Sequence, residues 1–108
     1  MSISLRDAQH VSWKTFRKIN DALKPEKSNE WTPLTVVTDL ANETSNIVST
    51  IKESEASKSS EESKAKDTLA TELADALYMI FVLAEHYGIE LEETFMQTVN
   101  DRMISMLR

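Results

Sequence analysis

The stretch Thr71-Glu72-Leu73-Ala74-Asp75-Ala76-Leu77 places two acids three residues apart inside the most apolar segment of the chain. In a helix, Glu72 and Asp75 lie on the same side, about 60° apart around the axis and about 4.5 Å apart along it. Two carboxylates at that separation repel each other unless water, a cation or a basic side chain lies between them. Acids at this spacing most often form a solvated face, but their apolar surroundings make this pair a candidate functional site.

The composition predicts one small all-α domain over residues 1–108. The chain has one Gly and two Pro, and chains so poor in turn-forming residues are usually helical. There is no cysteine, which excludes disulfides, cysteine metal sites and thiol nucleophiles. The net charge of −6 argues against a nucleic-acid polymer as partner. No signal-peptide run or membrane-spanning run is present, so we expect a cytoplasmic protein without a membrane partner.

Apolar spacing and cap residues predict four helices in a bundle-like domain. Ser4 is suited to cap the first helix, and Thr32-Pro33 combines a hydroxyl cap with a proline at the first helical position. Gly88, the only glycine, suits the position just after the end of the third helix. The helices are expected over about residues 5–23, 33–53, 68–87 and from about residue 91 onward.

The connection between the second and third helices is polar and of low complexity. Residues 54–66 contain nothing that could anchor a core, and we predict a flexible linker with frayed helix at each end. The third helix is apolar nearly all round, which predicts a central position and burial of a second side by another subunit. We therefore expect oligomerisation to complete the bundle.

Glu43 gives the acid pair a partner on another helix. Asp39, Glu43 and Asn46 lie at i, i+4 and i+7, so they form a polar line on the second helix. If the second and third helices pack antiparallel, this line can face Glu72 and Asp75, and facing carboxylates can build an oxygen-rich metal site. Without Cys, and without His on these lines, such a site favours Mg²⁺, Mn²⁺ or Ca²⁺ over Zn²⁺. That is the chemistry of phosphoanhydride cleavage, in which a carboxylate holds or deprotonates the attacking water.

Three stretches, in this order, resemble the MazG-like all-α nucleoside triphosphate pyrophosphohydrolases. The family pattern is Glu-x-x-Glu on one helix, a variable connection, Glu-x-x-Asp on the next helix, and then a glycine followed by an acidic helix start. The resemblance covers roughly residues 31 to 102, and it rests on residues 40–48, 72–78 and 83–95. Asn46 stands where the family's first motif ends in Glu, so it can ligate through its amide oxygen but carries no charge.

The resemblance implies Mg²⁺-dependent hydrolysis of a nucleoside triphosphate, with Mn²⁺ as a second candidate cation. The products would be the monophosphate and pyrophosphate, as in house-cleaning of (deoxy)nucleotides. Glu43, Glu72 and Asp75 would be the catalytic residues, and together with Asn46 they would hold the metal. The resemblance also implies a homodimer or a homotetramer.

Three further residues are candidates for binding the substrate. Asn100 and Arg102 are the nearest matches to the residues that contact phosphate on the family's last helix, although Arg102 fits a plain surface arginine equally well. Trp31 resembles an aromatic that precedes the first acidic helix and stacks on a base; packing in a core or an interface is the alternative. His10 and His86 have no partner apparent in the sequence and are assigned no role.

The residues leave alternatives to this enzyme. Asn46 breaks the first motif, which is compatible with a degenerate module that binds nucleotide or a partner without turnover. A helical oligomerisation module with solvated acids would show the same periodicity. A relative of the phosphoribosyl-ATP pyrophosphohydrolases would share the acidic helical pattern. Pyrophosphate release, measured with and without Mg²⁺, distinguishes these hypotheses.

Overall fold

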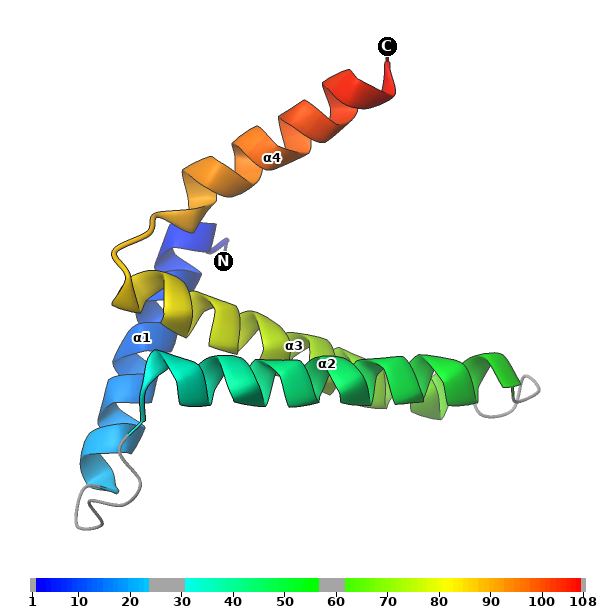
Figure 1. Cartoon of the computed structure of the whole chain (residues 1–108), viewed down its shortest axis with the longest axis horizontal. Helices are drawn as coiled ribbons and strands as arrows, with labels where there is room; N and C mark the ends of the chain where they lie inside the picture. The colour runs from blue at the N-terminus through cyan, green and yellow to red at the C-terminus, as the bar shows by residue number, and fades with distance from the viewer. Residues whose placement is uncertain (1, 24–30, 57–61, 108) are drawn as a thin grey trace. The chain divides into compact units, whose positions relative to one another are not determined.

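The structure, a computed structural model, describes residues 2–23, 31–56 and 62–107. Within them the chain forms four α-helices and no strand, so the predicted all-α fold is confirmed (Figure 1). The helices are α1 (Leu5–Ala22), α2 (Pro33–Ala56), α3 (Glu62–His86) and α4 (Leu91–Met106). Both α2 and α3 enter the expected linker 54–66, because its Ala, Glu and Lys residues favour helix. Its middle, residues 57–61, lies outside the described residues.

Side-chain caps begin α1 and α2 where the sequence predicts. Ser4 Oγ accepts a hydrogen bond of 3.0 Å from the backbone N–H of Asp7, within the first turn of α1. At α2, Thr32 and Thr35 cap each other. The N–H of Thr35 donates to Thr32 Oγ1 at 3.3 Å, and the N–H of Thr32 donates to Thr35 Oγ1 at 2.9 Å. These bonds satisfy donors that the helix itself leaves without partners.

The end of α3 is a turn that requires a left-handed residue. Gly88 has a φ of 68°, which is costly for any residue with a Cβ atom. The N–H of Ile89 donates to the carbonyl of Ala84 at 2.8 Å, and the N–H of Gly88 donates to the carbonyl of Glu85 at 3.1 Å. This pair of bonds is a Schellman motif, which ends α3 and turns the chain toward α4.

The chain divides into two compact units. The first unit consists of Met1–Pro25 and Phe81–Arg108, and the second of Glu26–Ile80. Because α3 runs through the boundary, its first residues belong to the second unit and its last two turns to the first.

In the first unit, one buried amide joins α1 to the turn between α3 and α4. Gln9 is only 2% exposed, and its Nε2 donates to Glu85 Oε2 and to the carbonyl of Ile89, both at 2.8 Å. Its Oε1 accepts from the N–H of Leu91 at 3.2 Å, at the first residue of α4. All the polar groups of this buried side chain are therefore used.

Charged side chains surround this amide at the surface. Arg6 Nε lies 2.6 Å from Glu90 Oε1, and His10 Nδ1 lies 2.8 Å from Glu85 Oε1. Exposed ion pairs contribute little to stability individually, so the buried amide is the main polar link. Close to this link in the sequence, α3 carries the buried apolar residues Phe81, Val82 and Ala84.

In the second unit, α2 and the first part of α3 run antiparallel, side by side (Figure 1). On each helix the half-buried and buried residues recur at alternating spacings of four and three, as in helices that pack along a seam. On α2 these are Val36, Leu40, Glu43, Ile47, Thr50 and Ser54. On α3 they are Ala65, Leu69, Glu72, Ala76 and Met79, with Tyr78 beside them.

Helical spacing predicts an apolar side of α2 that is only partly the inward side; it consists of Leu34, Val37, Leu40, Ala41, Ile47, Val48 and Ile51. Among these, Leu34, Val37 and Val48 are exposed, whereas Val36, which the spacing does not include, is buried. The β-branched and apolar residues of α2 cover much of its circumference, so spacing alone did not select the inward face.

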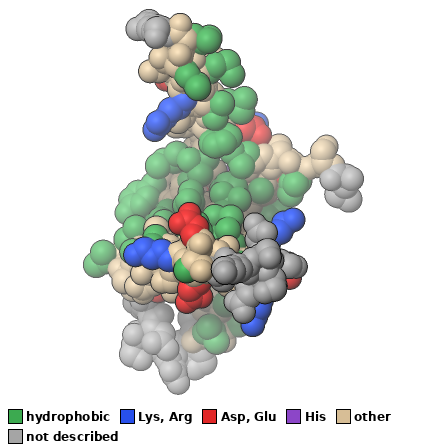
Figure 2. Space-filling view, turned by 90° about the vertical axis from the view of Figure 1, so that its right-hand side faces the viewer, with side chains coloured by type: hydrophobic (Ala, Val, Ile, Leu, Met, Phe, Trp, Pro, Cys, Tyr) green, Lys and Arg blue, Asp and Glu red, His purple; other side chains and the backbone are tan. Residues whose placement is uncertain are grey.

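Large apolar side chains also remain exposed on α4. Figure 2 shows hydrophobic side chains gathered along this helix, in the upper part of the view. They include Phe95, Met96, Val99, Met103, Ile104 and Met106. A search for membrane-spanning helices found none of sufficient length and apolar character among the described residues.

Candidate functional site

Two of the predicted site acids lie on the seam of the second unit. On the inward line of α2, Glu43 lies between Leu40 and Ile47, and all three residues are half-buried. Glu72 takes the corresponding place on α3 and is also half-buried, whereas Asp75, almost one turn later, is exposed. A half-buried carboxylate beside apolar residues is unfavourable for packing, so both acids are candidates for a role other than stability.

The acids of α2 and α3 act on each other. The pKa of Glu43 is raised from its ordinary value, first because partial burial disfavours its charged form, and then because Asp75 and Glu72 add negative charge nearby. The three predicted catalytic residues therefore lie close enough for Asp75 and Glu72 to affect Glu43. A bound cation would favour the charged form of Glu43.

A threonine that the sequence interpretation missed also belongs to this site. Thr50 Oγ1 donates a hydrogen bond of 2.7 Å to Glu72 Oε1, across the seam from α2 to α3. A signal was present, because Thr50 lies four residues after Asn46 and seven after Glu43, and so continues the polar line of α2. A threonine hydroxyl within a helix usually bonds the backbone of its own helix, so the sequence alone does not distinguish Thr50 from Thr38 or Thr44.

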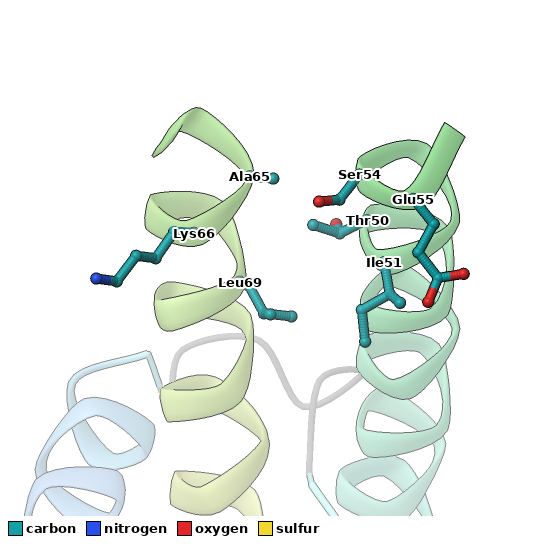
Figure 3. Close-up of a pocket in the computed structure, with 7 residues that line it drawn as sticks. All are labelled: Thr50, Ile51, Ser54, Glu55, Ala65, Lys66 and Leu69. Atoms are coloured by element: carbon teal, nitrogen blue, oxygen red, sulfur yellow. The ribbon is translucent and has the colours of Figure 1, made fainter. Parts of the chain in front are cut away.

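A groove of about 660 Å³ lies between α2 and α3, next to this hydrogen bond. In Figure 3, Thr50 and Ser54 of α2 face α3, Ala65 and Leu69 of α3 face α2, and Lys66 extends away from α2. The groove is therefore lined by apolar side chains and hydroxyl groups on its inner walls. Thr50 stands at the point where the groove meets the acids.

The oxygen atoms of these side chains are of the chemical type that binds a hard divalent cation. Carboxylate oxygens from two helices, together with an amide oxygen at Asn46, are the ligands that Mg²⁺ and Mn²⁺ accept. The pKa of Glu43 is raised mainly by partial burial and, after that, by the negative charges of Asp75 and Glu72. Among the described residues, however, no three acidic or imidazole side chains already form a cluster that could hold a metal ion. Binding would thus require the side chains of Glu43 and Asp75 to move toward Glu72.

The remaining predicted site residues belong to α2, to the residue before its cap, and to α4. Asn46 is exposed on α2, off the seam and almost one turn after Glu43. Trp31 is half-buried and immediately precedes the cap of α2. Asn100 and Arg102 lie on α4, in the first unit, and both are exposed. Their contacts with a substrate stay predictions.

His10, which the sequence left without a role, has a partner in the structure. Its Nδ1 pairs with Glu85, which also accepts from Gln9. Burial alone would raise the pKa of Glu85, but the hydrogen bonds from Gln9 and His10 outweigh it, so that the pKa is lowered. This pairing joins α1 to the last turn of α3, within the first unit.

Comparison with known proteins was made with family models, curated proteins and solved structures. A family model described as the MazG nucleotide pyrophosphohydrolase domain matches residues 31–105. The chain belongs to the MazG family. The MazG match contains α2, α3 and nearly all of α4, and with them every predicted site residue, while α1 precedes it. No curated protein and no solved structure matched the chain significantly.

Proposed function

We propose that this MazG domain is a nucleoside triphosphate pyrophosphohydrolase that depends on a divalent cation, Mg²⁺ or Mn²⁺. The observation that carries the proposal is the position of the half-buried Glu43 and Glu72 on the two sides of the seam between α2 and α3, with Asp75 close enough to affect Glu43. Family membership supports the reaction type, and the oxygen-only donor set supports the cation. The expected substrates are (deoxy)nucleoside triphosphates, with a house-cleaning role.

The reaction needs positioning and charge compensation rather than a covalent nucleophile. A water oxygen bonds to the α-phosphorus, the bond from that phosphorus to the bridging oxygen breaks, and pyrophosphate leaves with the bond's electron pair. The water proton passes to one of the carboxylates, of which Glu43 and Glu72 are half-buried. Glu43, Glu72, Asp75 and Asn46 would hold the cation, which when bound supplies positive charge against the triphosphate.

Residues other than Glu43, Glu72 and Asp75, here called the acid trio, are proposed to bind the rest of the substrate. Asn100 and Arg102 on α4 would contact phosphate, because an amide and a guanidinium both donate hydrogen bonds to phosphate oxygens. Trp31 would stack on the base, since every nucleobase has a flat face. These assignments rest on the family resemblance and on position in the chain.

We also propose that the chain assembles with copies of itself, as a homodimer or a homotetramer. On α4 the exposed residues Met96, Val99, Met103 and Met106 recur at spacings of three and four, which is the pattern of a helix that packs along a seam. An exposed apolar line of this length is typical of an interaction surface. We expect neither a nucleic-acid polymer nor a membrane as partner.

The proposed function is tested by measuring pyrophosphate release from a panel of ribo- and deoxynucleoside triphosphates and from phosphoribosyl-ATP. We expect monophosphate and pyrophosphate in equal amounts with Mg²⁺ or Mn²⁺, and no release with a chelator. Glu72→Gln should abolish release, whereas Glu53→Gln, a matched change at an exposed acid of α2, should not. Turnover of phosphoribosyl-ATP alone would assign the chain to that related activity.

A second candidate is a degenerate MazG module that binds nucleotide without turnover. The observation that favours it is the first acid motif, where Asn46 is uncharged and exposed. Binding of Mg²⁺ and nucleotide without release of pyrophosphate would support this candidate. Absence of both turnover and Mg²⁺-dependent thermal stabilisation would instead support a structural helical module.

A further inference from the structure

The hydroxyl of Thr50 has a different kind of hydrogen-bond partner from the hydroxyls of two other threonines on α2. Thr38 Oγ1 donates to the carbonyl of Leu34 at 2.7 Å, and Thr44 Oγ1 donates to the carbonyl of Leu40 at 2.9 Å, so both turn back onto their own helix. That is the usual arrangement for threonine within a helix. Thr50 instead donates across the seam to Glu72, 22 residues away in sequence.

Thr50 bonds a different partner from Thr38 and Thr44 because it lies on a different side of α2. Thr38 and Thr44 are exposed, whereas Thr50 is half-buried on the inward line of α2. A half-buried carboxylate gains from any donor that reaches it, and a bond between an O–H and a carboxylate is stronger than one to a neutral carbonyl. In Figure 3, Thr50 faces α3, which is the direction that the bond to Glu72 requires.

We propose that Thr50 is a positioning residue for Glu72, and that it sets the affinity with which the acid trio takes up a divalent cation. The hydrogen bond engages Oε1 of Glu72 and restricts the rotamers of the side chain, so that Glu72 would offer its other carboxylate oxygen to a bound cation. Donors that orient a ligand in this way typically change metal affinity by about 10- to 100-fold when they are removed. The proposal rests on the proposed function, because it takes Glu72 to be a metal ligand.

The test measures Mg²⁺ binding to the wild type and three variants in the absence of nucleotide. Binding is measured by titration calorimetry and by the increase in the thermal midpoint with Mg²⁺. Thr50→Val removes the hydroxyl at nearly constant volume, and Thr50→Ser restores it. Thr44→Val makes the same change on the same helix at a hydroxyl that bonds only the backbone. We expect Thr50→Val to weaken Mg²⁺ binding by about tenfold or more. Thr50→Ser and Thr44→Val should stay within about threefold of the wild type.

A double-mutant cycle of Thr50→Val with Glu72→Met, which removes both acceptor oxygens, tests the hydrogen bond separately in protein without metal. We expect the shifts in the thermal midpoint to be non-additive. Additive shifts, or wild-type Mg²⁺ affinity in Thr50→Val, would overturn the proposal while leaving the proposed function intact.

If wild-type protein neither binds Mg²⁺ nor releases pyrophosphate, the proposed function fails, and the role of Thr50 toward a cation fails with it. Non-additive shifts in the same experiment would then show that the bond from Thr50 to Glu72 is structural only. The two failures are thus distinguishable, because one is seen in the variant and the other in the wild type.

Discussion

Gln9, on α1, donates a 2.8 Å hydrogen bond from Nε2 to Oε2 of Glu85, in the last turn of α3. The two residues are 76 positions apart in sequence, and the same amide also bonds the backbone on either side of the start of α4. A single side chain therefore connects three segments of the first unit. Buried polar groups of this kind are costly when they lose a partner.

We predict that Gln9→Leu destabilises the protein by about 2–4 kcal/mol, because it leaves the carbonyl of Ile89 and the N–H of Leu91 without their partner. The measurement is urea denaturation at fixed protein concentration, since association would otherwise change the apparent stability. Gln97→Leu, at an exposed position of α4, is the matched control. Equal effects of the two substitutions would contradict the role given to Gln9.

Glu85 should make stability sensitive to acid. Its pKa is lowered from the ordinary 4.5 because hydrogen bonds from Gln9 and His10 outweigh the effect of burial. A carboxylate with a lowered folded-state pKa contributes stability above its unfolded-state pKa, and this contribution is lost as the pH falls through the folded-state value. We expect Glu85→Gln to have a lower thermal midpoint than the wild type at neutral pH, and the difference to shrink below pH 4.5.

The matched control for the acid experiment is Glu93→Gln, at an exposed acid of α4. Its midpoint should follow that of the wild type closely between neutral pH and acid. A constant difference between Glu85→Gln and the wild type at every pH would show that the charge of Glu85 does not contribute.

Asp75 is predicted to matter for turnover and not for folding. Because Asp75 is exposed and adds negative charge beside Glu43, Asp75→Ala should change the free energy of unfolding by no more than about 0.5 kcal/mol without metal. The same substitution should abolish pyrophosphate release. Stability is measured by denaturation, and activity by pyrophosphate release at saturating Mg²⁺. A large loss of stability would count against the assignment of Asp75 to a metal site.

Asn46→Glu tests whether the departure from the family pattern weakens the site. The substitution adds a charge almost one turn from Glu43, and a further carboxylate beside a divalent ion should tighten binding by about tenfold or more. Isothermal titration with Mg²⁺ measures the affinity directly. Weaker binding in the variant would show that position 46 does not contribute a ligand.

The apolar line of α4 is predicted to hold two copies of the chain together. Met103→Glu places a charge in the middle of this line, and we expect the mass measured by light scattering to fall toward that of the 12.3 kDa monomer. Gln97→Glu adds the same charge to the same helix at a polar position and should leave the mass unchanged. A wild type that is already monomeric would exclude the proposed assembly.

Much of the local structure followed from the sequence because its causes are local. A hydroxyl at Ser4 or Thr32 can satisfy free N–H groups only at a helix start, and Gly88 adopts a left-handed backbone that other residues avoid. The approach of Glu43 to Glu72 and Asp75 was also predictable. It needed only two helices with polar lines and a connection long enough to let them pack antiparallel.

The direction in which each helix faces was decided only by the tertiary structure. Gln9 lies at helical spacing between Leu5 and Ser12, yet as a polar residue it gave no sign that it would be buried. Val36 and Thr50 were likewise not predicted to face inward. Burial and hydrogen bonds across a seam depend on which residues of a distant segment stand opposite. Helix periodicity determines which residues share a face, but the partner determines which face is used.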